Sequence, residues 1–165
     1  MNIGILSDSH GNIARTRAAI AALKPYAPVH VIHCGDIGTN AVLDELAAGF
    51  AEPEVPVTCV LGNVDGWEGD LFSPVSFVRI EGRLAKLELG GKKIAVIHGD
   101  ESVRLRALIT NQTFDFIFTG HTHARSDERQ GRTRIINPGA LHRAAQPGCA
   151  ALDLNHGNLT YLDLH

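Results

Sequence analysis

The sequence contains few aromatic residues, with two Tyr, one Trp and six Phe in 165 residues, and its net charge is only −3. It contains no block of Lys and Arg, so we expect no specific nucleic-acid binding. No apolar run approaches the roughly 20 residues that a membrane-spanning helix needs. No charged segment followed by a long apolar run precedes the first predicted strand. These absences predict a protein without a membrane partner, located in the cytoplasm.

Cysteine is also scarce. Cys34, Cys59 and Cys149 are odd in number, widely separated and set in apolar runs. This pattern is typical of reduced thiols in a hydrophobic core and not of a disulfide framework. It agrees with the expected cytoplasmic location.

The length and the apolar content indicate one folding unit. A chain of 165 residues that is 44% hydrophobic can bury one substantial core but is short for two ordinary domains. We therefore expect a single domain over residues 1–165. The sequence leaves the oligomeric state open, a homo-oligomer included.

The first half of the chain alternates between strand and helix patterns. Apolar runs at 3–6, 29–34 and 57–61 predict strands, and the segments 13–24 and 40–49 have helical patterns between them. Asn12 is expected to cap the first helix. This alternation predicts parallel strands joined by crossover helices.

The second half is richer in strands. Strands are predicted at 76–80, 83–89, 92–97 and 114–118, with a helix over 101–111, and two hairpins are predicted at 124–136 and 149–164. The whole pattern belongs to the α/β class and predicts two mixed sheets packed together, with the helices outside.

Polar residues follow the predicted strands at points where a glycine is close by. They include four imidazoles, two carboxylates and one amide, which are more ligands than a single tetrahedral ion needs and suit two ions that share a carboxylate. These residues are Asp8, His10, Asp36, Asn63, His98, His121 and His123. Taken alone, Asp8 could cap a turn, His10 could be a surface residue and Asn63 could be a turn former.

The ordered motif set Asp8-x-His10, Gly35-Asp36, Gly62-Asn63, His98-Gly99 and Gly120-His121-x-His123 resembles that of the calcineurin-like metallophosphoesterase superfamily. The short chain is similar to its small YfcE-type phosphodiesterases. The resemblance implies a four-layer αββα sandwich and a dinuclear metal site. It implies that Asp8, His10 and His123 hold one metal, that Asn63, His98 and His121 hold the other, and that Asp36 bridges both.

The resemblance also implies a phosphodiesterase in which a metal-bridging hydroxide attacks phosphorus in line, with Asp36, Asn63 and His98 as catalytic residues. Two divalent ions, two carboxylates and one hydroxide leave a net positive charge, which would attract a phosphate oxyanion of a small phosphoester substrate. Mixed nitrogen and oxygen ligation favours Mn, Fe, Co, Ni or Zn over Ca or Mg, and we expect manganese first among them.

Two positions depart from the wider superfamily. Val64 stands where many members carry a histidine thought to protonate the leaving group, so aryl phosphodiesters should react better than alkyl ones unless water or a group such as Asp65 supplies the proton. Asp100 stands where the YfcE-like branch often has a second histidine after the His-Gly pair. This second difference leaves the substrate side of the pocket open.

The remaining histidines, His30, His33, His142, His156 and His165, lack motif support as ligands. His33 is expected to be packed beside the strand that delivers Asp36. For Asn12, helix capping is favoured over substrate contact. Trp67 could pack against a substrate or a neighbouring subunit, and the sequence does not separate these interpretations.

Two other function classes stay open at this point. One is a non-catalytic protein-binding scaffold of the same fold, as in a retromer subunit of the superfamily whose metal-site histidines are altered. The other is a dinuclear hydrolase of a non-phosphate bond, such as an amide or thioester. Retention of all the ligand positions favours catalysis, and the Gly35-Asp36 and Gly62-Asn63 elements favour a phosphoester.

Overall fold

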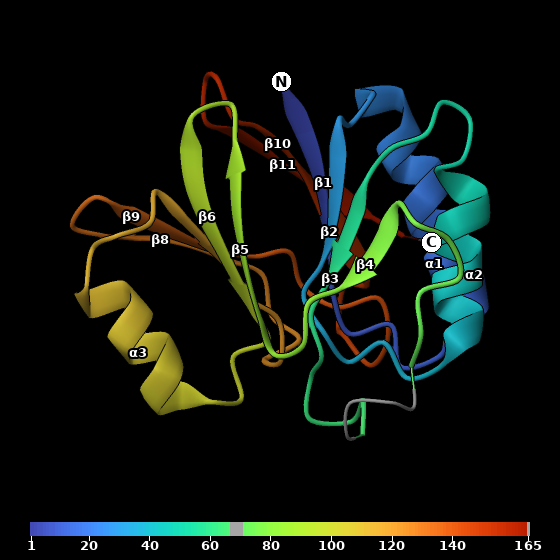
Figure 1. Ribbon diagram of the computed structural model, residues 1–165, viewed down its shortest axis with the longest axis horizontal. Helices are drawn as coiled ribbons and strands as arrows, with labels where there is room; N and C mark the ends of the chain where they lie inside the picture. The colour runs from blue at the N-terminus through green and yellow to red at the C-terminus, as the bar shows by residue number, and fades with distance from the viewer. Residues whose placement is uncertain (67–70, 165) are drawn as a thin grey trace.

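The computed structural model describes residues 1–66 and 71–164, and the chain forms two mixed β-sheets (Figure 1). The first sheet has the strand order β11-β10-β1-β2-β3-β4. Its members β1 to β4 pair in parallel, while β10 pairs antiparallel with both β1 and β11. The bounds are β1 Asn2–Leu6, β2 His30–His33, β3 Val57–Cys59, β4 Val78–Ile80, β10 Gly148–Asp153 and β11 Asn158–Asp163.

The second sheet has the strand order β5-β6-β7-β9-β8. Its central strands β6, β7 and β9 are parallel, and each edge strand forms an antiparallel hairpin with its neighbour. The bounds are β5 Leu84–Leu89, β6 Lys92–Ile97, β7 Phe116–Phe118, β8 Ser126–Gln130 and β9 Thr133–Asn137. Both predicted hairpins are confirmed, one formed by β8 and β9 in this sheet and the other by β10 and β11 in the first sheet.

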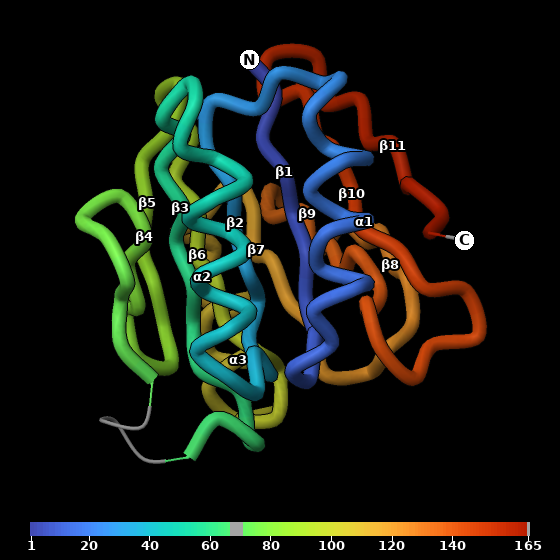
Figure 2. Tube along the Cα trace, turned by 90° about the vertical axis from the view of Figure 1, so that its right-hand side faces the viewer, coloured from blue at the N-terminus to red at the C-terminus, as the bar shows by residue number. Residues whose placement is uncertain are grey.

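Three layers of apolar side chains hold four layers of structure together. In β6, Ile94 and Val96 face the core between the sheets, whereas Ala95 and Ile97 face α3 (Ser102–Thr110). This alternation follows from the two-residue period of a strand that is buried on both faces. The third core lies between the first sheet and the pair α1 (Ile13–Leu23) and α2 (Asn40–Gly49). Figures 1 and 2 show α1 and α2 on the outer face of the first sheet and α3 on the far side of the second, as the αββα sandwich predicts.

The local structure refines several predicted boundaries. Asn12 caps α1, because its Oδ1 accepts a hydrogen bond of 3.0 Å from the Arg15 backbone N–H. After α1, Lys24–Tyr26 form a short 3-10 turn that contains Pro25. The predicted strand at 76–80 joins the first sheet as β4, so the chain changes sheets between Ile80 and Leu84.

All three cysteines are buried and free, as the sequence predicted. Within the described part of the chain, every helix is too short or too polar to cross a bilayer. The interpretations of Trp67 and His165 lie outside the described residues.

Candidate metal centre

The polar residues predicted from the motifs lie on loops at the carboxyl ends of five strands, near the lower end of both sheets in Figure 1. The loops after β1 and β2 are joined by main-chain hydrogen bonds from Asp8 N–H to Gly35 O, at 2.9 Å, and from His10 N–H to Asp36 O, also at 2.9 Å. In the second sheet, Gly120 N–H donates to His98 O at 2.8 Å. Backbone contacts therefore set the loops beside one another, and this edge is where open α/β sheets bind ligands.

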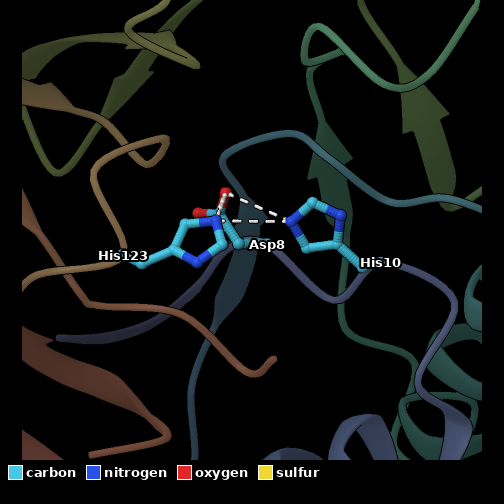
Figure 3. Close-up of side chains that lie close together, drawn as sticks. All are labelled: Asp8, His10 and His123. Carbon is cyan, nitrogen blue, oxygen red and sulfur yellow. Dashed lines mark hydrogen bonds and ion pairs between the residues drawn. The ribbon is translucent and has the colours of Figure 1, made fainter. Parts of the chain in front are cut away.

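Asp8, His10 and His123 form one compact group (Figure 3). The Nε2 atom of His123 lies 3.2 Å from Asp8 Oδ1, and the Nε2 atoms of His10 and His123 are 3.3 Å apart. His10 Nε2 is 3.9 Å from the same carboxylate oxygen. One oxygen and two ring nitrogens, from the loop after β1 and from the distant loop after β7, thus point at a common position.

Asp8, Asp36 and His98 form a second group. Asp36 Oδ2 lies 3.3 Å from His98 Nε2 and 3.6 Å from His10 Nε2, so one oxygen faces one imidazole from each group. Asp8 Oδ1 is also 3.9 Å from His98 Nε2. Both carboxylates therefore lie between the two sets of imidazoles.

Two buried atoms at this position lack a hydrogen-bond partner among the described residues. These are Asp8 Oδ1 and His98 Nε2. The side chain of Asp8 is 0% exposed and that of His98 is 1% exposed. An unpartnered buried polar atom costs about 1–3 kcal/mol, so two of them facing each other need an explanation. A cation would satisfy both, and the nitrogen and oxygen donors fit a divalent transition metal.

Neighbouring groups fix which ring atom and which oxygen face the site. His98 Nδ1 donates to the carbonyl of Cys34 at 2.8 Å, which leaves the Nε2 lone pair directed at the carboxylates. Asp8 Oδ2 accepts from the Ser7 hydroxyl at 2.6 Å and from the His121 N–H at 3.1 Å, which turns Oδ1 inward. The geometry is that of metal ligands oriented by an outer layer of hydrogen bonds.

Asn63 and His121 lie at the exposed edge of this arrangement. His121 Nδ1 is 3.1 Å from Asn63 Oδ1, and the ring of His121 is 5.2 Å from that of His98, measured between centroids. The two residues thus come together from different sheets and sit beside the second group. His121 belongs to neither of the two compact groups.

The pKa values reflect burial and mutual proximity. Burial raises the pKa of Asp8 above its ordinary value, and the Ser7 hydroxyl and the nearby imidazoles offset this only in part. Burial also acts to raise the pKa of Asp36, but His98 and the N–H of Val64, 3.0 Å from Oδ1, outweigh it and the value is lowered. For His98, burial acts to lower the pKa, but the carboxylates of Asp36 and Asp8 and the carbonyl of Cys34 together outweigh it and the pKa is raised. The carboxylates and imidazoles of the site are therefore strongly coupled electrostatically.

Backbone strain is concentrated at the same place. Among the described residues other than glycine, eight have a positive φ, and they include Asp8, His10, Asp36, His121 and His123. Residues other than glycine rarely adopt this backbone conformation, and Asn, Asp and His do so more often than the rest. Such strain persists where surrounding structure enforces it, which is characteristic of functional sites.

Several residues outside the proposed ligand set support the site through hydrogen bonds. His33 is fully buried, as expected, with Nε2 at 2.9 Å from Ser9 Oγ, and burial lowers its pKa to about 3. Asn137 donates to the carbonyl of Gly120 at 2.7 Å and so supports the loop that carries the two histidines. For Ser7 and Ser9, the only sequence feature that could have indicated a supporting role is their position beside Asp8 at the end of a buried strand.

Asp65 and Asp100, which the sequence analysis considered near the substrate, both hold other parts of the fold. Asp65 is buried, and its carboxylate accepts hydrogen bonds from Gly38 N–H at 2.8 Å and Gly62 N–H at 2.7 Å. These contacts argue against Asp65 as a proton donor to a leaving group. Asp100 pairs with Arg83, whose Nη1 also donates to Gly62 O at 3.1 Å.

Comparison with known families identifies the fold and its class of chemistry. The model of the calcineurin-like phosphoesterase superfamily domain matches residues 1–157 of the chain. The chain belongs to this superfamily. The family is one of dinuclear metal-dependent enzymes, and the described residues include two overlapping groups of candidate metal ligands.

Individual relatives agree with this assignment. The phosphodiesterase MJ0936 of Methanocaldococcus jannaschii is 30% identical over 142 residues, which cover 84% of this chain and 83% of the relative. A solved structure described as a novel archaeal phosphodiesterase has a TM-score of 0.85 at 26% identity, covering 99% of this chain and 100% of that one. The phosphoesterase YfcE of E. coli has a TM-score of 0.68 at 17% identity, with full coverage of both chains, and supports the fold alone.

Proposed function

We propose that this protein is a phosphodiesterase that acts with two divalent metal ions at the rim formed by the loops after β1, β2, β3, β6 and β7. The observation that carries the proposal is the meeting of two buried atoms, Asp8 Oδ1 and His98 Nε2, that have no hydrogen-bond partner among the described residues and belong to two overlapping groups of candidate metal ligands. Membership of the calcineurin-like phosphoesterase superfamily and the phosphodiesterase named among its relatives support the choice of reaction.

The proposed ligand assignment follows the two sets of imidazoles. Asp8, His10 and His123 would hold one ion, and Asn63, His98 and His121 the other. Asp36 would bridge both, which is supported by the position of its Oδ2 at 3.6 Å from His10 Nε2 and 3.3 Å from His98 Nε2. The contact of Asn63 with His121 supports their assignment to the same ion.

When bound, the ions would supply positive charge to the phosphoryl oxygens and lower the pKa of a water molecule that attacks phosphorus. The chain itself orients the site for this chemistry. The carbonyl of Cys34 keeps the proton of His98 on Nδ1, and Ser7 with the His121 N–H holds Asp8 in one rotamer. We propose Asp36, Asn63 and His98 as the residues closest to the reaction.

The leaving-group oxygen has no proton donor at the position where many superfamily members carry a histidine. Val64 is 47% exposed at that position and has no proton to give. The neighbouring Asp65 accepts two backbone hydrogen bonds and is buried. We therefore propose a preference for leaving groups that are stable as anions, such as aryl oxides.

Three finer points belong to the same proposal. Manganese is the proposed ion among the transition metals that accept nitrogen and oxygen ligands. The three free, buried thiols support a reducing compartment, for which we propose the cytoplasm. A homo-oligomer is proposed as the form to examine first.

A direct test measures hydrolysis of bis(p-nitrophenyl) phosphate, p-nitrophenyl phosphate and a p-nitroanilide amide, each with Mn, Co, Ni or Zn added to metal-free protein. We expect metal-dependent hydrolysis of the diester, and its loss in Asp36→Asn. Asp44→Asn is the matched control, because Asp44 is exposed and belongs to α2 and not to the loops that form the site. Hydrolysis of the amide alone would reassign the bond cleaved, and a metal-loaded protein that hydrolyses none of these would favour the scaffold.

A further inference from the structure

A histidine without motif support lies beside the proposed metal ligands. His142 is on the loop that follows β9, and its ring centroid is 5.9 Å from that of His10, with the ring planes at 54°. Its backbone N–H donates to the carbonyl of Asp8 at 3.1 Å, while the preceding Leu141 N–H donates to Ser7 O at 3.0 Å. Main-chain contacts to the end of β1 therefore hold this loop against the site.

The side chain of His142 is half-buried and has one polar partner among the described residues. Its Nδ1 lies 3.2 Å from Asn12 Nδ2, and Asn12 is the N-cap of α1. Because a backbone N–H can only donate, the bond from Arg15 N–H fixes Oδ1 of Asn12 as the acceptor. The other end of the amide facing His142 is then the NH2 group, which only donates.

This chain of hydrogen bonds determines the tautomer of the neutral ring. Since the Asn12 NH2 donates to His142 Nδ1, that nitrogen must be the one without a proton. The ring proton then lies on Nε2. Nε2 has no hydrogen-bond partner among the described residues, and the ring lies beside that of His10, so its N–H remains available next to the site.

We propose that His142 is a substrate-binding residue whose Nε2–H donates a hydrogen bond to a phosphoryl oxygen of the bound phosphoester, with its tautomer fixed by the cap residue Asn12. The inference rests on the proposed function, because it assigns a contact within the same site. It makes Asn12 a positioning residue that serves both the helix and the ligand. His142 would also supply a hydrogen-bond donor on the His10 side of the site. This matters because Val64 replaces the histidine that many superfamily members have.

The substitution Asn12→Asp gives a sharp test of the tautomer. The introduced carboxylate would keep the helix cap, since one of its oxygens still accepts the Arg15 N–H. Its other oxygen can only accept, so it would draw the proton to Nδ1 of His142 and leave a lone pair on Nε2 facing the phosphate. The first readout is the 15N chemical shifts of His142 in metal-free protein, for which we expect protonated Nε2 in the wild type and protonated Nδ1 in Asn12→Asp.

The second readout is binding of inorganic phosphate to the manganese-loaded protein, measured as inhibition of diester hydrolysis, together with KM and kcat. His142→Ala should weaken phosphate binding and raise KM by about tenfold, as expected for a lost hydrogen bond to a charged group, with a smaller change in kcat. His142→Gln retains an N–H donor and should recover most of the affinity. Neither substitution removes the backbone bond from residue 142 to Asp8.

A double-mutant cycle separates the tautomer from the negative charge that Asn12→Asp adds. If the tautomer matters, Asn12→Asp weakens phosphate binding more in the presence of His142 than in the His142→Ala background. Equal losses in both backgrounds, a wild-type ring protonated at Nδ1, or phosphate binding by His142→Ala within about twofold of wild type would overturn the inference. Failure of the wild type to hydrolyse any phosphodiester would instead overturn the proposed function, and the tautomer readout would still be obtained.

Discussion

Metal binding should raise the stability of this protein by an amount that depends on Asp8. Asp8 Oδ1 and His98 Nε2 are buried without hydrogen-bond partners among the described residues, and burial raises the pKa of Asp8. Each ion present at 100 times its dissociation constant stabilises the folded state by about 2.7 kcal/mol, and two ions by about 5 kcal/mol. For a chain of this size, about 2–4 °C of Tm corresponds to each kcal/mol, so we expect a rise of roughly 10–20 °C.

The substitution Asp8→Asn removes a buried charge and one ligand while keeping an oxygen for the Ser7 hydroxyl. The metal-free variant should melt at or above the wild-type temperature, because the raised pKa of Asp8 means that its charged form disfavours the fold at neutral pH. Its response to manganese should fall to at most half that of the wild type. Thermal melts with EDTA and with increasing manganese measure both quantities, with Asp44→Asn as control. A full metal response in Asp8→Asn would refute the reasoning.

Three further predictions concern separate features. Burial lowers the pKa of His30 to about 4, against about 6.5 in the unfolded chain, so its contribution to stability is complete above pH 6.5 and is lost as pH falls towards 4. Urea titrations of metal-free protein should show that His30→Gln loses about 2 kcal/mol less than wild type between pH 7 and pH 5, and equal losses would contradict the burial argument. Val64→His should raise the ratio of alkyl to aryl diester hydrolysis by about tenfold or more, and an unchanged ratio would mean that proton donation is not limiting. Gly120→Ala should destabilise the protein by about 1–3 kcal/mol and weaken metal binding, since a Cβ there would overlap the Ser7 hydroxyl and approach Asp8 Oδ2 to 2.7 Å. Wild-type metal affinity in that variant would show that the Ser7 contact does not orient Asp8.

The sequence was most informative where a single strand delivers its own polar residue. Asp8, His10 and Asp36 each follow a strand predicted from an apolar run, and the structure places them together at one rim. The same reasoning supplied the two mixed sheets, because hairpins and crossover helices leave local signals in turns and periodicity. The pattern also predicted that the sheets pack together with the helices outside, and the family resemblance implied the same αββα order.

The rest depends on contacts between segments far apart in the chain. β4 has the same strand pattern as β5 but pairs with β3 in the other sheet, a choice set by packing and not by its own residues. The tautomer of His98 depends on the carbonyl of Cys34, 64 residues away. Because every residue has a main-chain carbonyl, the sequence does not show which one accepts this hydrogen bond. His142 could not be distinguished from a surface histidine until the loop after β9 was placed beside Asn12.

The central claim is that two metal ions lie side by side at this rim and share the carboxylate of Asp36. Anomalous diffraction from manganese-loaded crystals tests it most directly. The account predicts two manganese peaks about 3.5–4 Å apart, one on each side of Asp36. A single peak, or peaks at which Asp36 is not a ligand to both ions, would contradict it.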